Sequence, residues 1–354
     1  MPPFVEDPSL SSMMASPRTL AKGGFLLGVI LLAATGFGAA WLASWRADRL
    51  AALDSASQVV ETSVGRVEFL RHGEGPALLI IHGTPGGYDQ AMLWGSSLVE
   101  EDFEIIAPSR PGYLRTPLSA GRRPAEQADT LAALIDTLGI PGVAILASSS
   151  GARVAVEFAV RHPAKLWALV LVSAVTGEHE DLKSEAKPEG IGFPALAPDA
   201  FTNEIGGMLC LEEAERNPRR IIPLVLEAGD NRTAAERDSL ASYVLDDTEQ
   251  LEWLKSLIGT FVPFSARQPG LRNDVSQFRD PPDLPVEKIT APTLLIHGTA
   301  DKIAPIAQAW KLASRIPGAV LYPVEGAGHL VEIGPGAAEV QKKIAQFLRQ
   351  HSGR

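Results

Sequence analysis

Serines between a predicted strand and a predicted helix are the first residues of this sequence that could do chemistry. Ser148, Ser149 and Ser150 stand between the apolar segment 143–147 and a helical pattern that begins at Gly151. A serine on a sharp strand-to-helix turn is exposed above the edge of a sheet, where it can attack a carbonyl carbon. The segment reads A-S-S-S-G, close to G-x-S-x-G with alanine in place of the first glycine. Ser149 is therefore the predicted nucleophile, although the adjacent serines leave the register open.

A histidine has to take the proton of such a serine. His329 lies in the loop G-A-G-H-L after the last predicted strand and is the predicted general base. His82 and His297 each follow a buried strand in a His-Gly pair, a position typical of a ring that braces a loop. The other histidines lie in a predicted hairpin, at a helix end, in a helical insertion and in the tail: His72, His162, His179 and His351.

An acid has to orient that imidazole and stabilise its cation. Asp301 follows the apolar segment 293–296 and is the predicted acid, in the order Ser…Asp…His that this type of turn favours. Asp301 could instead cap a following helix, which is a common task for aspartate. Glu178 and Asp181, which follow the preceding strand, are competing candidates for the acid.

The loop H-G-T-P-G-G at residues 82–87 could surround a developing negative charge with backbone N–H groups. Pro85 has no N–H, so the amide of Thr84 is the predicted donor, paired with the amide of Ser150. No Gly-Lys-Ser/Thr follows, which excludes a phosphate-binding loop. The sequence contains no His-Glu-x-x-His cluster and no dinucleotide-binding glycine pattern after a strand, so we expect neither a metal nor a cofactor.

Short apolar segments of the buried-strand type alternate with helical patterns through most of the chain. The predicted strands are 59–61, 67–70, 77–81, 104–107, 143–147, 166–173, 293–296 and 319–322. The clearest predicted helix begins at Pro124 and ends before Gly139, and others cover 151–161, 303–315 and 337–349. This alternation predicts a mostly parallel sheet with helices on both faces. The loops that carry Ser149 and His329 would then meet at the carboxyl edge of the sheet.

Between residues 175 and 289 the alternation stops. This stretch is more charged and mostly helical in pattern, especially over 231–258, and it ends in the proline-rich run 280–285. We interpret it as a helical cap inserted into a single domain that covers residues 59–350.

The N-terminal part of the chain precedes the predicted domain and forms a separate segment. Residues 23–45 are uncharged and mostly apolar, and as a helix they would span roughly 34 Å, enough to cross a bilayer. We therefore predict a tail over residues 1–22, a transmembrane anchor over 23–45 and a stalk over 46–58. The catalytic domain would then lie on the outer, periplasmic or extracellular side. A cleaved export signal, with small residues around Gly38, and a buried soluble helix are the alternatives.

Composition limits the classes of function. Lys and Arg number 32 against 42 Asp and Glu, a net charge of −10, which argues against a nucleic-acid partner. Apolar residues make up 45% of the 354 residues, so the chain is neither disordered nor too short for a large core. The single cysteine, Cys210, cannot form an intramolecular disulfide.

These motifs, in this order, resemble the α/β-hydrolase superfamily over about residues 59–350, and in particular its serine esterase-like members. The resemblance implies an α/β-hydrolase fold with Ser149 as nucleophile, Asp301 as acid, His329 as base, and Thr84 and Ser150 as oxyanion donors. The His-Gly-x-Pro loop also resembles epoxide hydrolases and proline iminopeptidases. Serine at position 149 disfavours the Asp-nucleophile epoxide hydrolases and haloalkane dehalogenases, and A-S-S-S-G differs from the iminopeptidase G-G-S-W-G.

Two departures from the superfamily bear on substrate more than on mechanism. The turn lacks its first glycine, and Ser109 stands where the loop D-x-R-G-x-G-x-S usually has aspartate. We expect a carboxylesterase-like enzyme that hydrolyses an ester-like bond of a small molecule through an acyl-enzyme. The same three residues could instead hydrolyse a carbon–carbon bond or catalyse cofactor-free perhydrolysis. An alternative of another class is a non-catalytic, membrane-tethered ligand-binding protein on a hydrolase fold.

Overall fold

The computed structural model describes residues 17–177, 203–279, 281 and 283–352, and the side chains from residue 36 onwards. Its contacts divide the chain into two units, with the boundary between Ala51 and Ala52 in the sequence. Helix α1 (Pro17–Ala56) supplies the described part of the first unit. The second unit contains every strand and every other helix described below.

The predicted membrane anchor, residues 23–45, falls within α1. The side chains of residues 23–35 lie outside the described part of the chain. Among the residues that were described, no helix is both long enough and apolar enough to cross a bilayer. The structure therefore does not support the anchor, which stays a prediction. The helix continues to Ala56 without a break, so most of the predicted stalk is helical.

An eight-stranded sheet is the centre of the second unit, with the strand order β1-β2-β4-β3-β5-β6-β7-β8. The pairs β1–β2 and β2–β4 are antiparallel, and all the other neighbours are parallel. This confirms the predicted, mostly parallel sheet. The strands are β1 (Gln58–Thr62), β2 (Gly65–His72), β3 (Ala77–Ile81), β4 (Glu104–Pro108), β5 (Val143–Ser148), β6 (Leu166–Val172), β7 (Thr293–Gly298) and β8 (Val320–Val324).

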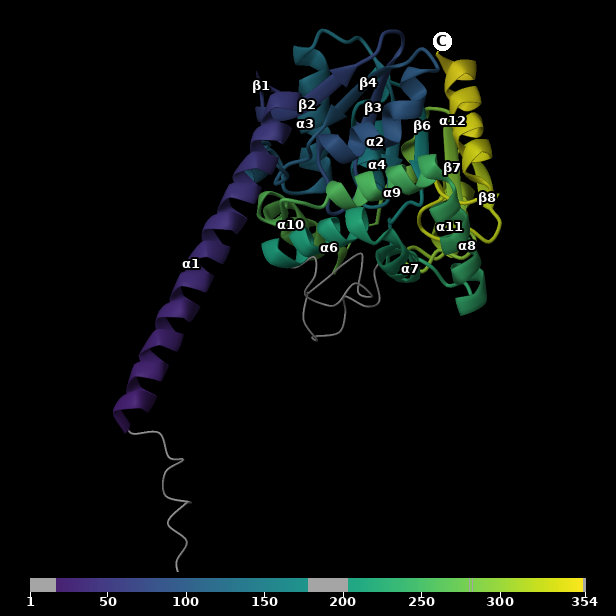
Figure 1. Ribbon diagram of the computed structural model, residues 1–354. Helices are drawn as coiled ribbons and strands as arrows, with labels where there is room; N and C mark the ends of the chain where they lie inside the picture. The colour runs from purple at the N-terminus through teal and green to yellow at the C-terminus, as the bar shows by residue number, and fades with distance from the viewer. Residues whose placement is uncertain (1–16, 178–202, 280, 282, 353–354) are drawn as a thin grey trace, which may run out of the picture. The chain divides into compact units, whose positions relative to one another are not determined.

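Helices cover both faces of this sheet, because successive side chains of a strand point to opposite sides (Figure 1). Leu78 and Ile80 of β3 belong to the core under α2 (Tyr88–Val99) and α12 (Ala337–His351). Leu79, between them, belongs to the core under the helices of the other face. Those helices are α3 (Pro124–Thr137), α4 (Gly151–Arg161) and α11 (Ala307–Arg315). Strands buried on both faces explain the uninterrupted apolar runs in the sequence.

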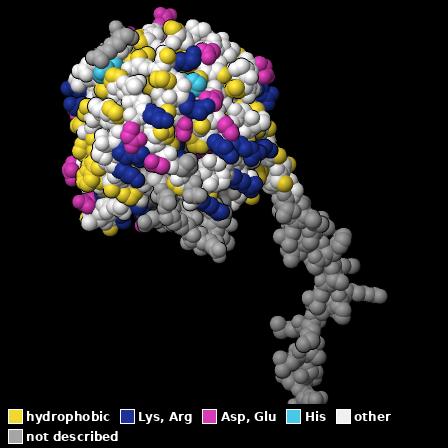
Figure 2. Space-filling model, turned by 180° about the vertical axis from the view of Figure 1, so that it is seen from behind, with side chains coloured by type: hydrophobic (Ala, Val, Ile, Leu, Met, Phe, Trp, Pro, Cys, Tyr) yellow, Lys and Arg dark blue, Asp and Glu magenta, His cyan; other side chains and the backbone are white. Residues whose placement is uncertain are grey.

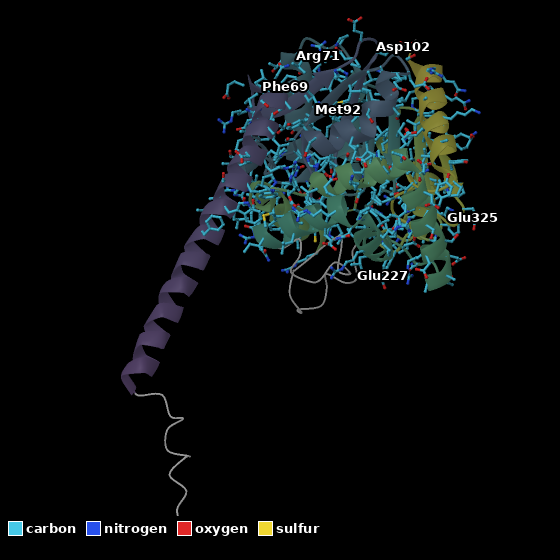
Figure 3. The ribbon with its side chains drawn as sticks, viewed as in Figure 1. Phe69, Arg71, Met92, Asp102, Glu227 and Glu325 are labelled. Atoms are coloured by element: carbon cyan, nitrogen blue, oxygen red, sulfur yellow. The ribbon has the colours of Figure 1, made fainter. Side chains whose placement is uncertain are left out.

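The predicted cap lies between β6 and β7 and is helical where it is described. Its helices lie along the edge of the sheet where the parallel strands end (Figure 1). They are α6 (Glu204–Arg216), α7 (Pro218–Ala228), α8 (Ala234–Asp246), α9 (Thr248–Gly259) and α10 (Gln268–Phe278). Short 3-10 helices complete the second unit: η2 (Leu118–Ala120), η3 (Pro163–Lys165), η5 (Phe264–Ala266) and η6 (Val286–Lys288). Arg71 and Asp102 mark the opposite edge, away from the cap (Figure 3).

The face of the molecule seen in Figure 2 intersperses acidic and basic side chains with apolar ones. Several ion pairs of the described chain lie at the surface, among them Arg161 with Asp129 and Arg315 with Asp283. Exposed pairs of this kind contribute little to stability, so the fold depends mainly on its two buried apolar layers.

Candidate active site

The backbone turns sharply between β5 and α4, and Ser149 stands at the turn. Its φ of 53° lies in the left-handed region, which residues other than glycine rarely adopt. The Ser149 amide donates a hydrogen bond of 3.0 Å to the carbonyl of Val172 on the neighbouring strand, and this bond holds the turn. A Cβ on Gly151 would lie 2.6 Å from the carbonyl oxygen of Ile81, so only glycine fits there. Ala147, which stands in place of the first glycine of the motif, is fully buried.

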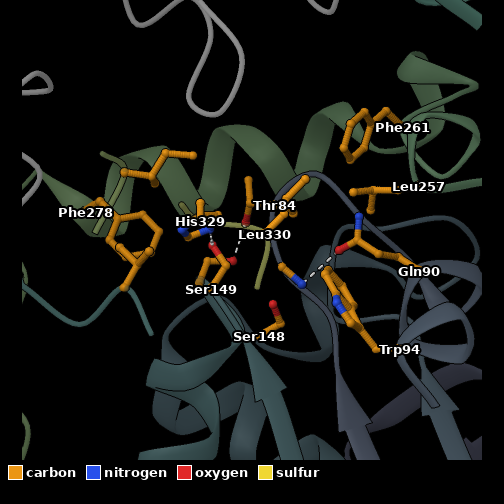
Figure 4. A pocket seen from close by; sticks show the side chains of 14 residues that line it. Thr84, Gln90, Trp94, Ser148, Ser149, Leu257, Phe261, Phe278, His329 and Leu330 are labelled. Carbon is orange, nitrogen blue, oxygen red and sulfur yellow. Dashed lines mark hydrogen bonds between the residues drawn. The ribbon is translucent and has the colours of Figure 1, made fainter. Parts of the chain in front are cut away.

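The structure brings Ser149, His329 and Asp301 together after the ends of β5, β7 and β8, and Figure 4 shows Ser149 beside His329. The Ser149 Oγ lies 3.0 Å from His329 Nε2, and His329 Nδ1 lies 2.8 Å from Asp301 Oδ2. The Ser150 hydroxyl instead contacts the Thr84 hydroxyl at 2.6 Å, and Ser148 lines the adjacent pocket. Of the three serines, Ser149 is the one that contacts the imidazole.

Two competing candidates for the acid, Glu178 and Asp181, lie outside the described residues. Asp301 occupies the position next to His329 that an orienting acid requires. Its other oxygen, Oδ1, accepts hydrogen bonds from the amides of Ile303 and Ala304, at 2.8 and 2.9 Å. One oxygen of the carboxylate thus faces His329 and the other binds the loop that follows. The predicted alternative, a helix cap, is wrong, because the next helix begins only at Ala307.

Protonation states follow from the surroundings of the two groups. Burial alone would raise the pKa of Asp301, but the charge of His329 and the hydrogen bonds from both histidine rings outweigh it and lower that pKa to about 2. Burial would lower the pKa of His329, but the charge and hydrogen bond of Asp301 raise it above its ordinary value. Because an ionised carboxylate only accepts hydrogen bonds, Nδ1 of His329 carries a proton. Its Nε2 can then accept the proton of Ser149.

A second histidine supports the acid. His297, at the end of β7 and almost fully buried, places its Nε2 2.7 Å from the carbonyl of Ala304 and 3.2 Å from Asp301 Oδ2. It therefore braces the loop that carries the acid, as its His-Gly position suggested. The hydrogen bonds from His297 and from the two loop amides leave the Asp301 carboxylate little freedom to turn away from His329.

The backbone of His329 is held from two sides. Its carbonyl accepts a hydrogen bond of 2.7 Å from the Ser173 hydroxyl, at the end of β6. Its amide donates a bond of 3.0 Å to the carbonyl of Gly229, which follows α7 in the cap. The cap is therefore part of the scaffold of this loop, a connection that no pattern in the sequence indicated.

The loop after β3 lies against Ser149. A Cβ on Gly83 would lie 3.3 Å from the Cβ of Ser149, so the loop backbone approaches the nucleophile closely. Gln90 of α2 shapes the loop: its Oε1 accepts from the Gly83 amide at 3.0 Å, and its Nε2 donates to the carbonyl of Pro85 at 2.7 Å. Within the described chain, the amides of Thr84 and Ser150 have no hydrogen-bond acceptor among the protein groups. Both are available to an oxygen atom of a substrate.

A pocket opens above Ser149. Its polar lining consists of the three serines, Thr84, Gln90 and His329. The remaining side chains are apolar (Figure 4): Trp94, Val175, Leu257, Phe261, Phe278, Ile303 and Leu330. Among the described residues, none with a formally charged side chain at neutral pH lines this pocket. A mostly apolar lining with a few polar groups is typical of a site for a small organic molecule.

The departure at Ser109 has a structural explanation. The Ser109 hydroxyl donates a hydrogen bond of 2.9 Å to Glu68 Oε2, on the neighbouring strand β2. Glu68 is fully buried and also accepts hydrogen bonds from the side chain and amide of Arg115. A buried carboxylate is therefore present in this region, but Glu68 supplies it. Sequence reasoning missed it because the two residues are distant in the chain.

No group of three or more His, Cys, Asp or Glu side chains in the described residues could hold a metal ion. The arrangement can instead activate a serine hydroxyl beside two free amides, in a mostly apolar pocket. Nucleophilic attack on a carbonyl group requires these groups.

Known proteins resemble this chain over most of its length. The model of the alpha/beta hydrolase family matches residues 78–340. The hydrolase YcgS of Bacillus subtilis, itself uncharacterized, is 27% identical over 292 residues, or 80% of this chain and 95% of that protein. A 2-hydroxymuconate semialdehyde hydrolase of Pseudomonas putida is 28% identical over 288 residues, or 78% of this chain and 89% of that protein.

Among solved structures, an alpha/beta hydrolase fold protein from Nakamurella multipartita has a TM-score of 0.77 and 29% identity. The match covers 84% of this chain and 100% of that one. Family model, fold and order of elements agree, and the chain belongs to the alpha/beta hydrolase family.

Proposed function

We propose that the protein is a serine hydrolase that cleaves an ester-like bond of a small, uncharged molecule through an acyl-enzyme. The observation that carries the proposal is the contact of Ser149 Oγ with His329 Nε2 at 3.0 Å. On the other side of the imidazole ring, His329 Nδ1 lies 2.8 Å from Asp301 Oδ2. A nucleophile, a base and an orienting acid in this relation can perform acyl transfer.

In this mechanism His329 takes the proton of Ser149 as the hydroxyl attacks the carbonyl carbon of the substrate. The amides of Thr84 and Ser150 stabilise the oxyanion that forms. His329 then gives its proton to the departing alcohol, and the acyl group remains on Ser149. A water molecule, deprotonated by His329, attacks the acyl-enzyme and releases the acid.

The pocket lining supports an uncharged substrate. A carboxylate in an apolar pocket needs a cation or several hydrogen-bond donors to offset its desolvation. Arg110 is the buried cation nearest the Ser150 hydroxyl in the described chain, and it forms a two-pronged pair with Asp274 at 2.6 and 3.0 Å. Since its charge is already neutralised, Arg110 offers little to a substrate carboxylate.

Hydrolysis of a carbon–carbon bond by the same three residues is the second candidate. It is favoured by the similarity to the 2-hydroxymuconate semialdehyde hydrolase, whose substrate is, by its name, a carboxylate. The missing cation in the described pocket lining counts against a substrate of that kind.

Labelling with a fluorophosphonate probe, followed by mapping of the modified peptide, tests the proposal. We expect wild-type protein to be modified at Ser149 and the Ser149→Ala and His329→Ala variants to remain unmodified. Modification of Ser148 or Ser150 would change the identity of the nucleophile. A folded protein that is not labelled would exclude an activated serine.

A matched substrate panel separates the two candidates. It contains aryl esters of butyrate, the same esters with a terminal carboxylate on the acyl chain, and a 2-hydroxy-6-oxo-dienoate. We expect the uncharged esters to have the highest kcat/KM. A preference for the dienoate would assign the protein to carbon–carbon bond hydrolysis. Peracid formation from acetate and peroxide is measured in the same panel, as the test of perhydrolysis.

A further inference from the structure

A carboxylate of the cap lies directly behind the loop that faces Ser149. Asp274, on α10, is 5% exposed and far in sequence from the residues it contacts. Its Oδ1 accepts a hydrogen bond from Arg110 at 3.0 Å, and its Oδ2 accepts from Arg110 and Tyr113, both at 2.6 Å. The hydroxyl of Thr84 also donates to Oδ2. One carboxylate thus connects the cap with two loops of the main domain.

The carboxylate sets the direction of a short chain of hydrogen bonds. Because the single proton of the Thr84 hydroxyl goes to Asp274, the Ser150 hydroxyl must be the donor in its 2.6 Å contact with Thr84. The Ser150 oxygen in turn accepts from Arg110 at 3.2 Å. The side chains of both residues whose amides are free beside Ser149 are therefore fixed by the pair of Arg110 and Asp274.

Arg110 also holds the backbone of the same loop. Its Nε donates to the carbonyl of His82 at 3.1 Å and its Nη2 to the carbonyl of Gly83 at 3.2 Å. The Arg110 amide donates to His82 Nε2 at 3.0 Å. Asp274 keeps the guanidinium in the plane that these bonds require, because a two-pronged pair between a guanidinium and a carboxylate is planar. The pair is electrically neutral, so it adds no net negative charge near a developing oxyanion.

Two features hold α10 close to the loops that follow β3 and β4. Gly270, one turn before Asp274, lets the helix approach closely, since a Cβ there would lie 2.3 Å from the Tyr113 ring. The Gly270 amide donates to the carbonyl of Gly112 at 2.8 Å. Arg267 holds the far end of the loop, with bonds of 2.8 Å to the carbonyl of Gly86 and to Asp89.

We propose that Asp274 is a positioning residue of the oxyanion hole, which acts from the cap through Arg110 and the Thr84 hydroxyl to aim the amides of Thr84 and Ser150 at the substrate oxygen. The inference rests on the proposed function, because it concerns the same reaction. It predicts that the cap is needed for transition-state stabilisation in addition to substrate binding.

The test compares Asp274→Asn, Thr84→Val and the double variant with wild-type full-length protein, on an aryl butyrate and with a phenylboronic acid. A boronic acid forms a tetrahedral adduct with an active serine, so its affinity reports on oxyanion stabilisation. Asparagine keeps the shape of Asp274 and removes its charge. Valine keeps the shape and amide of Thr84 and removes the hydroxyl. Asp129→Asn is the matched control, because it breaks a pair with Arg161 on the surface.

We expect Asp274→Asn to lower kcat about 10- to 100-fold, the effect of a slightly misplaced donor, with KM nearly unchanged. The Ki of the boronic acid rises by the same factor. Thr84→Val gives a similar loss, and the double variant is no worse than the more impaired single variant, since both changes break one connection. Asp129→Asn leaves kcat and Ki unchanged.

Active-site titration with the fluorophosphonate gives kcat per correctly folded site, which separates misfolding from misplacement. Asp274→Asn with wild-type kcat and Ki per site would overturn the inference and leave the proposed function intact. Additive effects of the two substitutions would also overturn it. A wild-type protein that neither hydrolyses the ester nor reacts with the probe would overturn the proposed function, and this inference with it.

Discussion

Each functional group of the site is fixed by several hydrogen bonds from different elements. Asp301 shows this most clearly, since two amides hold one oxygen and two histidine rings share the other. Asparagine has nearly the shape of aspartate and lacks its charge. The electrostatic contribution of this residue can therefore be measured separately from its contribution to packing.

Asp301→Asn should lower kcat by about 10³- to 10⁴-fold. An asparagine can donate to His329 Nδ1, which favours the tautomer with its proton on Nε2, where it cannot accept from Ser149. Steady-state kinetics on an aryl butyrate measure the effect, with thermal unfolding as the check on structure. Asp283→Asn, at an exposed carboxylate that pairs with Arg315, is the control. Activity within tenfold of wild type would contradict the role of Asp301.

A second carboxylate influences the base. Burial raises the pKa of Glu332 to about 7. Besides the larger effects of burial and of Asp301, the charge of Glu332 contributes to raising the pKa of His329. Because the proposed reaction needs neutral His329, wild-type kcat/KM should increase with pH through a pKa above the ordinary value of 6.5.

Glu332→Gln should move this acid limb to lower pH, since it removes a negative charge that stabilises the imidazolium. The pH profile of kcat/KM measures the shift. Glu325→Gln removes the same charge from the same connection between β8 and α12, at an exposed position (Figure 3), and should leave the limb in place. If the acid limb of Glu332→Gln lay at the same pH as in the wild type or at higher pH, the expected interaction between Glu332 and His329 would be contradicted.

At the scale of elements, boundaries with a strong local signal were predicted well. The helix expected between Pro124 and Gly139 is observed at Pro124–Thr137, and the helix expected at residues 151–161 has those bounds. The helix expected from residue 303 begins only at Ala307. The amides of Ile303 and Ala304 bind the Asp301 carboxylate instead of starting the helix. A long-range requirement of the site thus overrides the local pattern.

The turn between β5 and α4 is the element whose geometry the site most depends on. A methyl group at Gly151 would lie 2.6 Å from the carbonyl oxygen of Ile81 and 2.7 Å from that of His82, so α4 or β3 would have to move. Gly151→Ala should therefore reduce the free energy of unfolding by about 1–3 kcal/mol. It should also lower kcat at least tenfold, because Ser149 moves relative to His329.

Gly142→Ala is the matched control at the other end of β5. A Cβ there would lie 3.4 Å from the nearest atom, the carbonyl oxygen of Lys165, which is an ordinary contact. Its free energy of unfolding should stay within about 0.5 kcal/mol of wild type. Chemical denaturation and steady-state kinetics measure both variants. Equal effects of the two alanines would refute the steric explanation.

At the scale of the whole molecule, the sequence indicated the residues that lie after strands and missed those that the cap contributes. Ser149, Asp301 and His329 follow predicted strands, so the rule that parallel strands end at one edge brings them together. No such rule places Asp274 or Gly229 beside the site. Their contacts depend on how the insertion folds back over the sheet, and α10 carries no motif for it.

The N-terminal segment gives the last prediction. Every residue of the candidate site lies in the unit that begins at Ala52. Asp54 and Ser57, which contact Arg115, lie close to its start. A variant that lacks residues 1–46 keeps all of these contacts. It should therefore hydrolyse a water-soluble ester with the same kcat/KM as the full-length protein.

The full-length protein and the variant that lacks residues 1–46 should be found in different cell fractions. If residues 23–45 form the predicted anchor, the full-length protein sediments with membranes and resists alkaline carbonate, because an apolar helix that crosses a bilayer is released only when the bilayer is dissolved. The shortened protein stays in the supernatant. Sequencing the N-terminus of the mature protein distinguishes an intact anchor from a cleaved export signal. A full-length, uncleaved protein found in the supernatant would refute the anchor and leave the proposed reaction unaffected, because the site lies entirely in the other unit.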